Sequence, residues 1–140
     1  MSRIFFDTNL FIYLFEGSGE EADRVAALRE RILERRDQLF TSALTLGEIL
    51  VKPIEAADEA LATRYTRAIE ATATVVPFSA EAAPLYARVR LDRSIRPPDA
   101  IQLACAAAAQ IDLFITNDER LSRKSVSGIQ FITSLERAFL

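Results

Sequence analysis

The sequence has 140 residues, of which 50% are hydrophobic and 26% charged, and its formal net charge is -3. This length and balance are typical of one folded domain, so residues 1–140 are expected to form a single domain. The absence of histidine and the single cysteine exclude Ser-His-Asp and Cys-His catalysis, an internal disulfide and a zinc knuckle.

Any catalysis therefore has to use carboxylates, lysine, hydroxyl groups or a bound metal. The one cysteine, Cys105, lies in an alanine-rich segment and is expected to be a small buried apolar residue. No stretch approaches the ~20 apolar residues of a membrane span, and the N-terminus lacks the core of a signal peptide, so we expect a cytoplasmic protein. The negative net charge argues mildly against a protein that coats nucleic acid.

The first half of the chain alternates short apolar segments with amphipathic ones. Arg3–Phe6 is expected to be a strand that ends at Asp7-Thr8-Asn9, a capping sequence, and a helix should follow up to Gly17. Further on we expect a helix over residues 20–36, a strand over 38–42, a helix over 44–51 that Pro53 stops, a helix over 58–72 and a strand over 73–78.

The second half continues the alternation. Ser79 is expected to cap a helix that runs to about residue 91, and Pro97-Pro98 should begin an alanine-rich helix with Asp99 in its first turn. A strand over 112–116, a strand over 129–133 and a short final helix complete the chain. Strands alternating with helices predict an α/β fold with three layers, in which helices cover both faces of a mainly parallel sheet of about five short strands.

Four acidic residues occupy positions that this fold brings toward one edge of the sheet. Asp7 and Asp118 follow strands, Asp99 begins a helix, and Glu48 lies in the helix after the second strand. Carboxylates at close range repel one another by ~4 kcal/mol per pair at 4 Å, so such a group requires cations. Oxygen ligands alone favour Mg²⁺ or Mn²⁺, and one or two such ions would let a protein without histidine hydrolyse a phosphodiester.

Taken singly, three of these acids also have an ordinary structural explanation. Asp7 fits a helix cap, Asp99 fits a first-turn acid that complements the helix dipole, and Asp118 fits a turn. Glu48 is harder to explain in this way, because apolar residues such as Leu46 and Ile49 surround it in the sequence. The case for a metal site therefore depends on the four acids acting together.

Four segments resemble the motifs of the PIN domain family, and more narrowly of the small VapC-like ribonuclease toxins of toxin-antitoxin pairs. They are Ile4–Asn9, Leu46–Ile49, Pro98–Ala104 and Phe114–Asp118, in the family's order and at similar intervals. The resemblance implies a PIN-like three-layer fold, endonucleolytic cleavage of RNA with 5′-phosphate and 3′-hydroxyl ends, an antitoxin partner and a homodimer.

The resemblance also implies which residues act. Asp7, Glu48, Asp99 and Asp118 would be the catalytic metal ligands, and Thr8, Asn9 and Thr116 would support them by hydrogen bonds. The sequence departs from the family after Asp118, where many relatives carry an acid two residues on and then an aromatic residue, whereas Glu119-Arg120-Leu121 follows here. We favour Asp118 over Glu119 as the ligand because Glu119 fits the first turn of a helix.

Two arginine clusters adjoin the acids in sequence: Arg93 and Arg96 precede Asp99, whereas Arg120 and Arg123 follow Asp118. They are candidates for binding RNA phosphates, and the alternative is a solvated helix face. Apolar side chains of the first helices present a similar choice between a dimer contact and the core. They are Tyr13, Val25 and Leu28.

Other α/β functions fit the sequence less well than a ribonuclease toxin. A dehalogenase-like phosphatase would need an acid where Asn9 stands, and a receiver domain would need paired acids near its first strand. A housekeeping RNA-processing PIN enzyme and a non-catalytic PIN-like binding module remain open alternatives.

Overall fold

The computed structural model describes all 140 residues and contains one five-stranded sheet with the strand order β3-β2-β1-β4-β5. The strands are β1 (Arg3–Phe6), β2 (Gln38–Ser42), β3 (Thr74–Val76), β4 (Leu113–Thr116) and β5 (Phe131–Ser134). All four strand pairings are parallel, so the carboxyl ends of the strands point to one edge of the sheet. The predicted α/β class with a parallel sheet of five short strands is confirmed.

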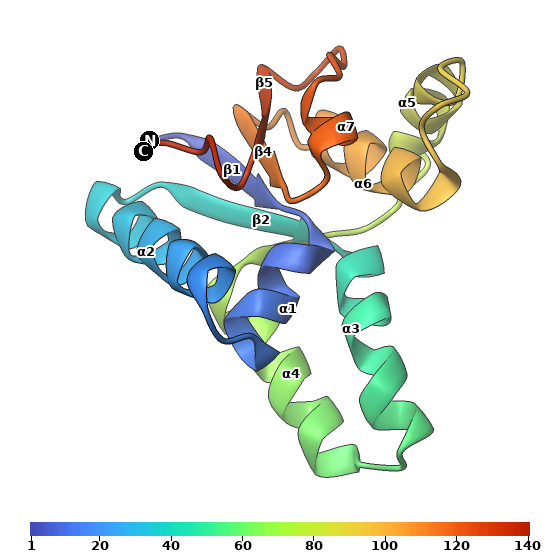
Figure 1. The fold of residues 1–140 in the computed structure, drawn as a ribbon. Coiled ribbons are helices and arrows are strands. Elements are labelled where there is room, and N and C mark those ends of the chain that lie inside the picture. Colours follow the sequence, from blue (N-terminus) through green and yellow to red (C-terminus); the bar gives the residue numbers. More distant parts are fainter.

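Seven helices connect and cover the strands (Figure 1). They are α1 (Thr8–Glu16), α2 (Glu20–Arg35), α3 (Ala43–Glu55), α4 (Glu59–Thr72), α5 (Ala82–Val89), α6 (Pro97–Ala108) and α7 (Glu119–Ser122). None of them combines the length and the apolar character that a membrane crossing requires.

Alternating side chains of the central strand β1 divide the interior into two cores. Ile4 and Phe6 pack with α1, α2 and α4 on one face, whereas Phe5 packs with α5 and α6 on the other. On the second face the rings of Phe5 and Phe114 stack with their centroids 4.9 Å apart. Because each fully buried side chain of this size contributes ~1.5–3 kcal/mol, the two cores fix the sheet between its helical layers.

Helices α3 and α4 run antiparallel and extend together away from the sheet (Figure 1). We expected α3 to stop at Pro53, but the helix continues to Glu55 with Pro53 inside it. The prediction was wrong because Pro53 lies only two residues before Glu55, the last residue of α3, and the proline ring is buried there. One backbone hydrogen bond is lost, and the burial of the ring offsets part of that cost.

Two further predictions on helices were wrong. Ser79 does not cap the helix after β3; its carbonyl accepts hydrogen bonds from Ala82 and Ala83 in a turn, and α5 begins at Ala82. The expected final helix is absent, and residues 135–137 form a turn after β5. The last residues instead fasten the chain end to α2, as described next.

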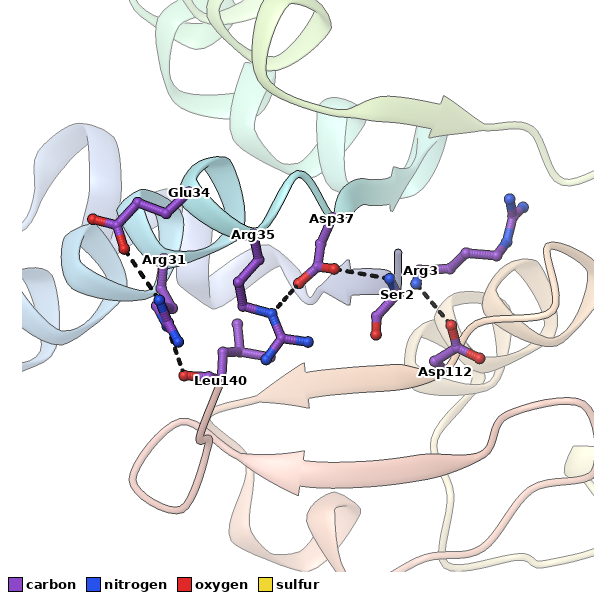
Figure 2. A network of polar contacts seen from close by, with 8 residues as sticks. All are labelled: Ser2, Arg3, Arg31, Glu34, Arg35, Asp37, Asp112 and Leu140. Atoms are coloured by element: carbon purple, nitrogen blue, oxygen red, sulfur yellow. Dashed lines mark hydrogen bonds and ion pairs between the residues drawn. The ribbon is translucent and has the colours of Figure 1, made fainter.

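A polar network joins the two chain ends to the C-terminal part of α2 (Figure 2). The Asp37 carboxylate accepts hydrogen bonds from the Ser2 backbone and from the Arg35 guanidinium, both at 2.8 Å. The Arg31 guanidinium donates to the Leu140 carbonyl at 2.9 Å. Ser2 directly precedes β1, so this network lies at the amino end of the central strand, opposite the edge where the acids lie.

Candidate acidic active site

The four predicted acids line one cavity of about 330 Å³ at the carboxyl edge of the sheet. Asp7 directly follows β1 and caps α1, and Asp118 follows β4 and caps α7. Asp99 lies in the first turn of α6, and Glu48 lies in α3. The three elements β1, α3 and α6 meet here because α3 begins directly after the carboxyl end of β2, and the first turn of α6 lies at the same edge. The structure therefore brings together all four acids that the sequence singled out.

The Asp7 carboxylate is 7% exposed and faces into a set of hydrogen-bond donors. Its Oδ1 atom accepts from the Thr8 backbone at 2.8 Å and from Gln102 Nε2 at 3.1 Å, and its Oδ2 atom accepts from Thr116 Oγ1 at 2.7 Å. The bond to Thr8 is the expected helix cap, so the capping role and the placement in the cavity coexist. Three donors on one carboxylate fix its orientation.

Gln102 connects the elements around this carboxylate. Its side chain is 2% exposed, and Nε2 lies 3.1 Å from Thr8 Oγ1 and 2.7 Å from Thr45 Oγ1 in addition to its contact with Asp7. Its Oε1 atom accepts a hydrogen bond from the Ser42 hydroxyl. Gln102 thus joins α6 to the ends of β1 and β2 and to the first turn of α3.

Glu48 is exposed but is tied to the same network through Thr8. The Thr8 hydroxyl donates to Glu48 Oε1 at 2.7 Å and lies 3.1 Å from Thr45 Oγ1. The second carboxylate oxygen of Glu48 makes no hydrogen bond within the chain. Thr8 therefore links the buried acid of β1 to the exposed acid of α3.

Asp118 is held in place by its own helix and by Thr116. Its Oδ1 atom accepts from the backbones of Arg120 and Leu121, and its backbone N–H donates to Thr116 Oγ1 at 3.1 Å. Its Oδ2 atom stays free of hydrogen bonds. Glu119, the alternative ligand considered from the sequence, is exposed and does not line the cavity.

Burial and mutual repulsion both raise pKa values in the cavity. Burial raises the pKa of Asp7, against the hydrogen bonds from Thr116, Thr8 and Gln102. Burial, then the charges of Asp7 and Asp118, raise the pKa of Asp99 to about 6, while the charge of Arg96 lowers it. Asp99 makes no hydrogen bond with its side chain. The carboxylates thus lack a compensating positive charge within the cavity.

The predicted supporting residues separate into two groups. Thr8 and Thr116 each hydrogen-bond to an acid of the cavity, as expected. Asn9 lines the cavity, but its side chain is exposed and makes no hydrogen bond. Its expected contact with a ligand is therefore not present in the structure.

Two of the four predicted arginines line a cavity beside the acids, and two do not. Arg120 and Arg123 line a second cavity of about 270 Å³ together with Lys124, and this cavity shares Asp99 and Asp118 with the first. Arg93 and Arg96 are exposed and line neither cavity, although the charge of Arg96 acts on Asp99.

Several donor atoms in the cavity suit a hard divalent cation. The donor set consists of oxygen atoms, and one oxygen of Glu48, one of Asp118 and both of Asp99 are free of hydrogen bonds with the chain. No three acids are arranged to hold an ion by themselves. Bound cations would relieve the repulsion that raises the pKa of Asp99, so the chemistry of the residues fits Mg²⁺ or Mn²⁺.

Sequence reasoning missed Gln102, Ser42 and Thr45. A signal for Gln102 was present, since it is the one polar side chain in the buried run from Ala100 to Ala107 and lies three residues after Asp99, on a neighbouring part of the same helix face. Ser42 and Thr45 carry no such signal, because a serine and a threonine at a helix start are explained by capping, and Ser42 does cap α3. Cys105 is 1% exposed, as expected, and burial raises the pKa of its thiol to about 11.

Comparisons with known proteins agree with this architecture. Residues 4–126 match the model of the PIN domain family, whereas no curated protein sequence matches the chain. The chain is similar in structure to a chain of VapBC2 from Rickettsia felis bound to a promoter DNA fragment, with a TM-score of 0.73, 15% identity, and coverage of 94% of this chain and 98% of that one.

Two other solved structures have the same fold. DNA-bound VapBC from Salmonella typhimurium gives a TM-score of 0.69 and 20% identity over 96% of this chain and 99% of that one. A toxin-antitoxin complex from Klebsiella pneumoniae gives a TM-score of 0.64 and 24% identity over 90% of this chain and 94% of that one.

Proposed function

Because this chain belongs to the PIN domain family, we propose that it is a metal-dependent endoribonuclease that hydrolyses RNA phosphodiester bonds at the acidic cavity. The observation that carries the proposal is the convergence of Asp7, Glu48, Asp99 and Asp118 on one cavity from four separate segments of the chain. We treat residues 1–140 as one PIN domain.

In this proposal the same four carboxylates hold one or two Mg²⁺ or Mn²⁺ ions, directly or through water. When bound, such ions would place positive charge beside the scissile phosphate and would lower the pKa of a water molecule that serves as nucleophile. Asp99 offers two free oxygens, and Glu48 and Asp118 offer one each. Glu48 is exposed, so its side chain has room to turn toward an ion.

The other residues of the site position these ligands. Thr116 and Gln102 hold the Asp7 carboxylate, and Thr8 couples Glu48 to the same network. Arg120 and Arg123, beside the acids, bind the phosphates that flank the scissile bond. Arg93 and Arg96 line neither cavity. In this proposal they therefore contact RNA phosphates further from the cleaved bond.

We propose further that the ribonuclease is a toxin, active in the cytoplasm and held inactive by a cognate antitoxin. The support is the fold shared with VapBC and toxin-antitoxin structures. A homodimer is part of this proposal, but Val25 and Leu28 cannot be its contacts, since both are buried in the core. Tyr13 is half-buried, and its hydroxyl accepts a hydrogen bond from Asn117 at 2.7 Å.

An RNA cleavage assay tests the function. Wild type should cleave RNA with added Mg²⁺ or Mn²⁺ and leave 5′-phosphate and 3′-hydroxyl ends. Cleavage should stop when a chelator is added. Asp7→Asn and Asp99→Asn should each lower the rate roughly 100-fold or more. Glu119→Gln is the matched control, because Glu119 is an acid next to the site that does not line the cavity. Cleavage that survives chelation or both substitutions would overturn the proposal.

A further inference from the structure

A third cavity, of about 390 Å³, lies between α5 and the segment of residues 123–127 that follows α7. Its apolar lining consists of Leu85 and Val89 of α5, of Ile95, and of Val126 from the facing segment. Val89 and Ile95 are buried members of the core, and Leu85 and Val126 pack against it. The apolar lining is therefore a fixed surface of the fold. The volume lies within the ~300–1,000 Å³ of typical small-ligand sites.

This third cavity continues the line of the other two. Ile95, Arg123 and Lys124 line both it and the cavity of about 270 Å³. That middle cavity in turn shares Asp99 and Asp118 with the acidic cavity. The three cavities thus adjoin one another in a row that leads from the carboxylates, past basic side chains, to the apolar lining of the third cavity.

Three basic side chains and one acid, Asp92, line the third cavity. Arg88 and Arg123 are exposed, and their guanidinium groups donate no hydrogen bond to the rest of the chain, so both groups are available to a ligand. Lys124 is anchored between the two cavities by Asp92 at 2.9 Å and by the Ser94 hydroxyl at 2.7 Å. The cavity therefore combines an apolar lining with two free guanidinium groups, while its one acid is paired with Lys124.

We propose that this third cavity is a base pocket: it binds one unpaired base of the RNA strand whose scissile phosphate lies at the acidic cavity. The proposal rests on the proposed ribonuclease function and adds the place of a base contact beside the acidic and middle cavities. A base packs its flat face on aliphatic side chains, and the phosphates beside it attract arginines. Ser125 and Ser127, also in the lining, offer hydroxyls to the edge of the base.

An RNA base is favoured over an apolar peptide by the charge and by the position of the pocket. A peptide side chain of apolar character would need neither free guanidinium group. The strand that enters the acidic cavity carries a phosphate at every nucleotide, which matches the basic side chains along the row. Double-stranded RNA keeps its bases stacked and paired, so only an unpaired nucleotide can place a base here.

Methyl NMR spectra of the full chain test the pocket directly. The probes are the four ribonucleoside 5′-monophosphates, with ribose 5-phosphate and N-acetyl-leucinamide as comparison compounds. At least one nucleotide should shift the methyl signals of Leu85, Val89 and Val126 saturably, whereas ribose 5-phosphate should not. Shifts from no nucleotide, equal shifts from ribose 5-phosphate, or shifts from N-acetyl-leucinamide alone would overturn the proposal.

A substitution that fills the pocket provides a second test. Val126→Phe should weaken nucleotide binding about tenfold without changing the charge. Leu33→Phe is the control, since Leu33 is an exposed apolar residue of α2 outside the three cavities. If Val126→Phe fails to fold, Arg88→Gln and Arg123→Gln should weaken binding of the same nucleotide, and unchanged binding in both would contradict the proposal.

The two proposals fail in different ways. RNA cleavage without nucleotide binding at Val126 would leave the ribonuclease function standing and reject the base pocket. Nucleotide binding without cleavage of RNA in Mg²⁺ or Mn²⁺ would reject the function, and with it the assignment of the pocket to the substrate.

Discussion

The Nε2 atom of Gln102 lies 3.1 Å from the Oδ1 atom of Asp7, and through this contact α6 holds the carboxylate at the end of the central strand. The same amide nitrogen also contacts Thr8 and Thr45. A single buried side chain therefore aligns the acid of β1 with the helix that carries Asp99 and the helix that carries Glu48.

Replacing Gln102 should impair both the fold and the site. Gln102→Leu keeps a similar volume but leaves the buried Ser42 hydroxyl without its acceptor and removes one donor from the Asp7 carboxylate, at a cost of about 1–3 kcal/mol for each group. We expect urea unfolding to report this loss and RNA cleavage to fall about 10-fold or more at temperatures where the variant is folded. Gln130→Leu, on an exposed residue, should change neither; an equal effect of the two substitutions would argue against the role of Gln102.

Asp99 should make stability without metal depend on pH. Burial, then the charges of Asp7 and Asp118, raise its pKa from 3.8 to about 6, so the folded state binds this proton more tightly than the unfolded state. The contribution of the protonated Asp99 carboxyl group to the free energy of unfolding is fully present below pH 3.8. It is lost as the pH rises through 6 and the group ionises.

Asp99→Asn removes that dependence. In chelator at pH 7 the variant should be more stable than wild type by about 1–2 kcal/mol, after allowance for solvent screening of a half-buried group, and the difference should vanish near pH 3. Urea denaturation of both proteins across this range measures it. A difference that is independent of pH, or a variant that is less stable at pH 7, would be inconsistent with the raised pKa.

The polar network at the opposite end should stabilise the fold without affecting the chemistry. Asp37→Ala removes the acceptor of the Ser2 backbone and of Arg35, and we expect a loss of about 1–3 kcal/mol in the free energy of unfolding with an unchanged cleavage rate per folded molecule. Glu34→Ala breaks only the exposed pair with Arg31 and should cost less than about 0.5 kcal/mol. Equal losses of stability in the two variants would show that the Asp37 contacts stabilise the fold no more than the exposed pair of Glu34 with Arg31 does.

The arginines of the middle cavity should contribute to RNA binding through phosphates. Arg120→Gln and Arg123→Gln should each weaken binding of a fluorescent RNA and reduce the slope of log affinity against log salt concentration by about 1. Arg67→Gln makes the same charge change on an exposed position of α4, away from the cavities, and should leave the slope unchanged. A uniform effect of all three would indicate that only the net charge matters.

Much of the fold follows from local sequence signals. The apolar run that ends at Asp7 and the Pro97-Pro98 start of α6 combine periodicity with a capping or helix-starting residue, and both elements lie where they were expected. The predictions from Pro53 and Ser79 were wrong because the effect of each residue depends on tertiary context. The buried ring of Pro53 is tolerated near a helix end. The Ser79 carbonyl accepts backbone hydrogen bonds in a turn.

The site was predictable where several weak signals agreed. Each of the four acids has an ordinary local explanation, and the structure even realises two of these, since Asp7 and Asp118 cap helices. Their convergence could be inferred because parallel strands end at one edge. The hydrogen-bond partners of Gln102 could not be inferred from the sequence, because they come from β2 and α3. Only the packing of α6 against these two elements decides which hydroxyl groups the Gln102 amide contacts.

Divalent metal binding to the four carboxylates is the central claim, and a titration with Mn²⁺ followed by electron paramagnetic resonance tests it most directly. Wild type should bind one or two ions, and asparagine at Asp7, Asp99 or Asp118, or glutamine at Glu48, should each weaken binding about tenfold or more, while Glu119→Gln should not. The account is contradicted if wild type binds no Mn²⁺ at millimolar concentration, or if the four substitutions bind it as tightly as wild type does.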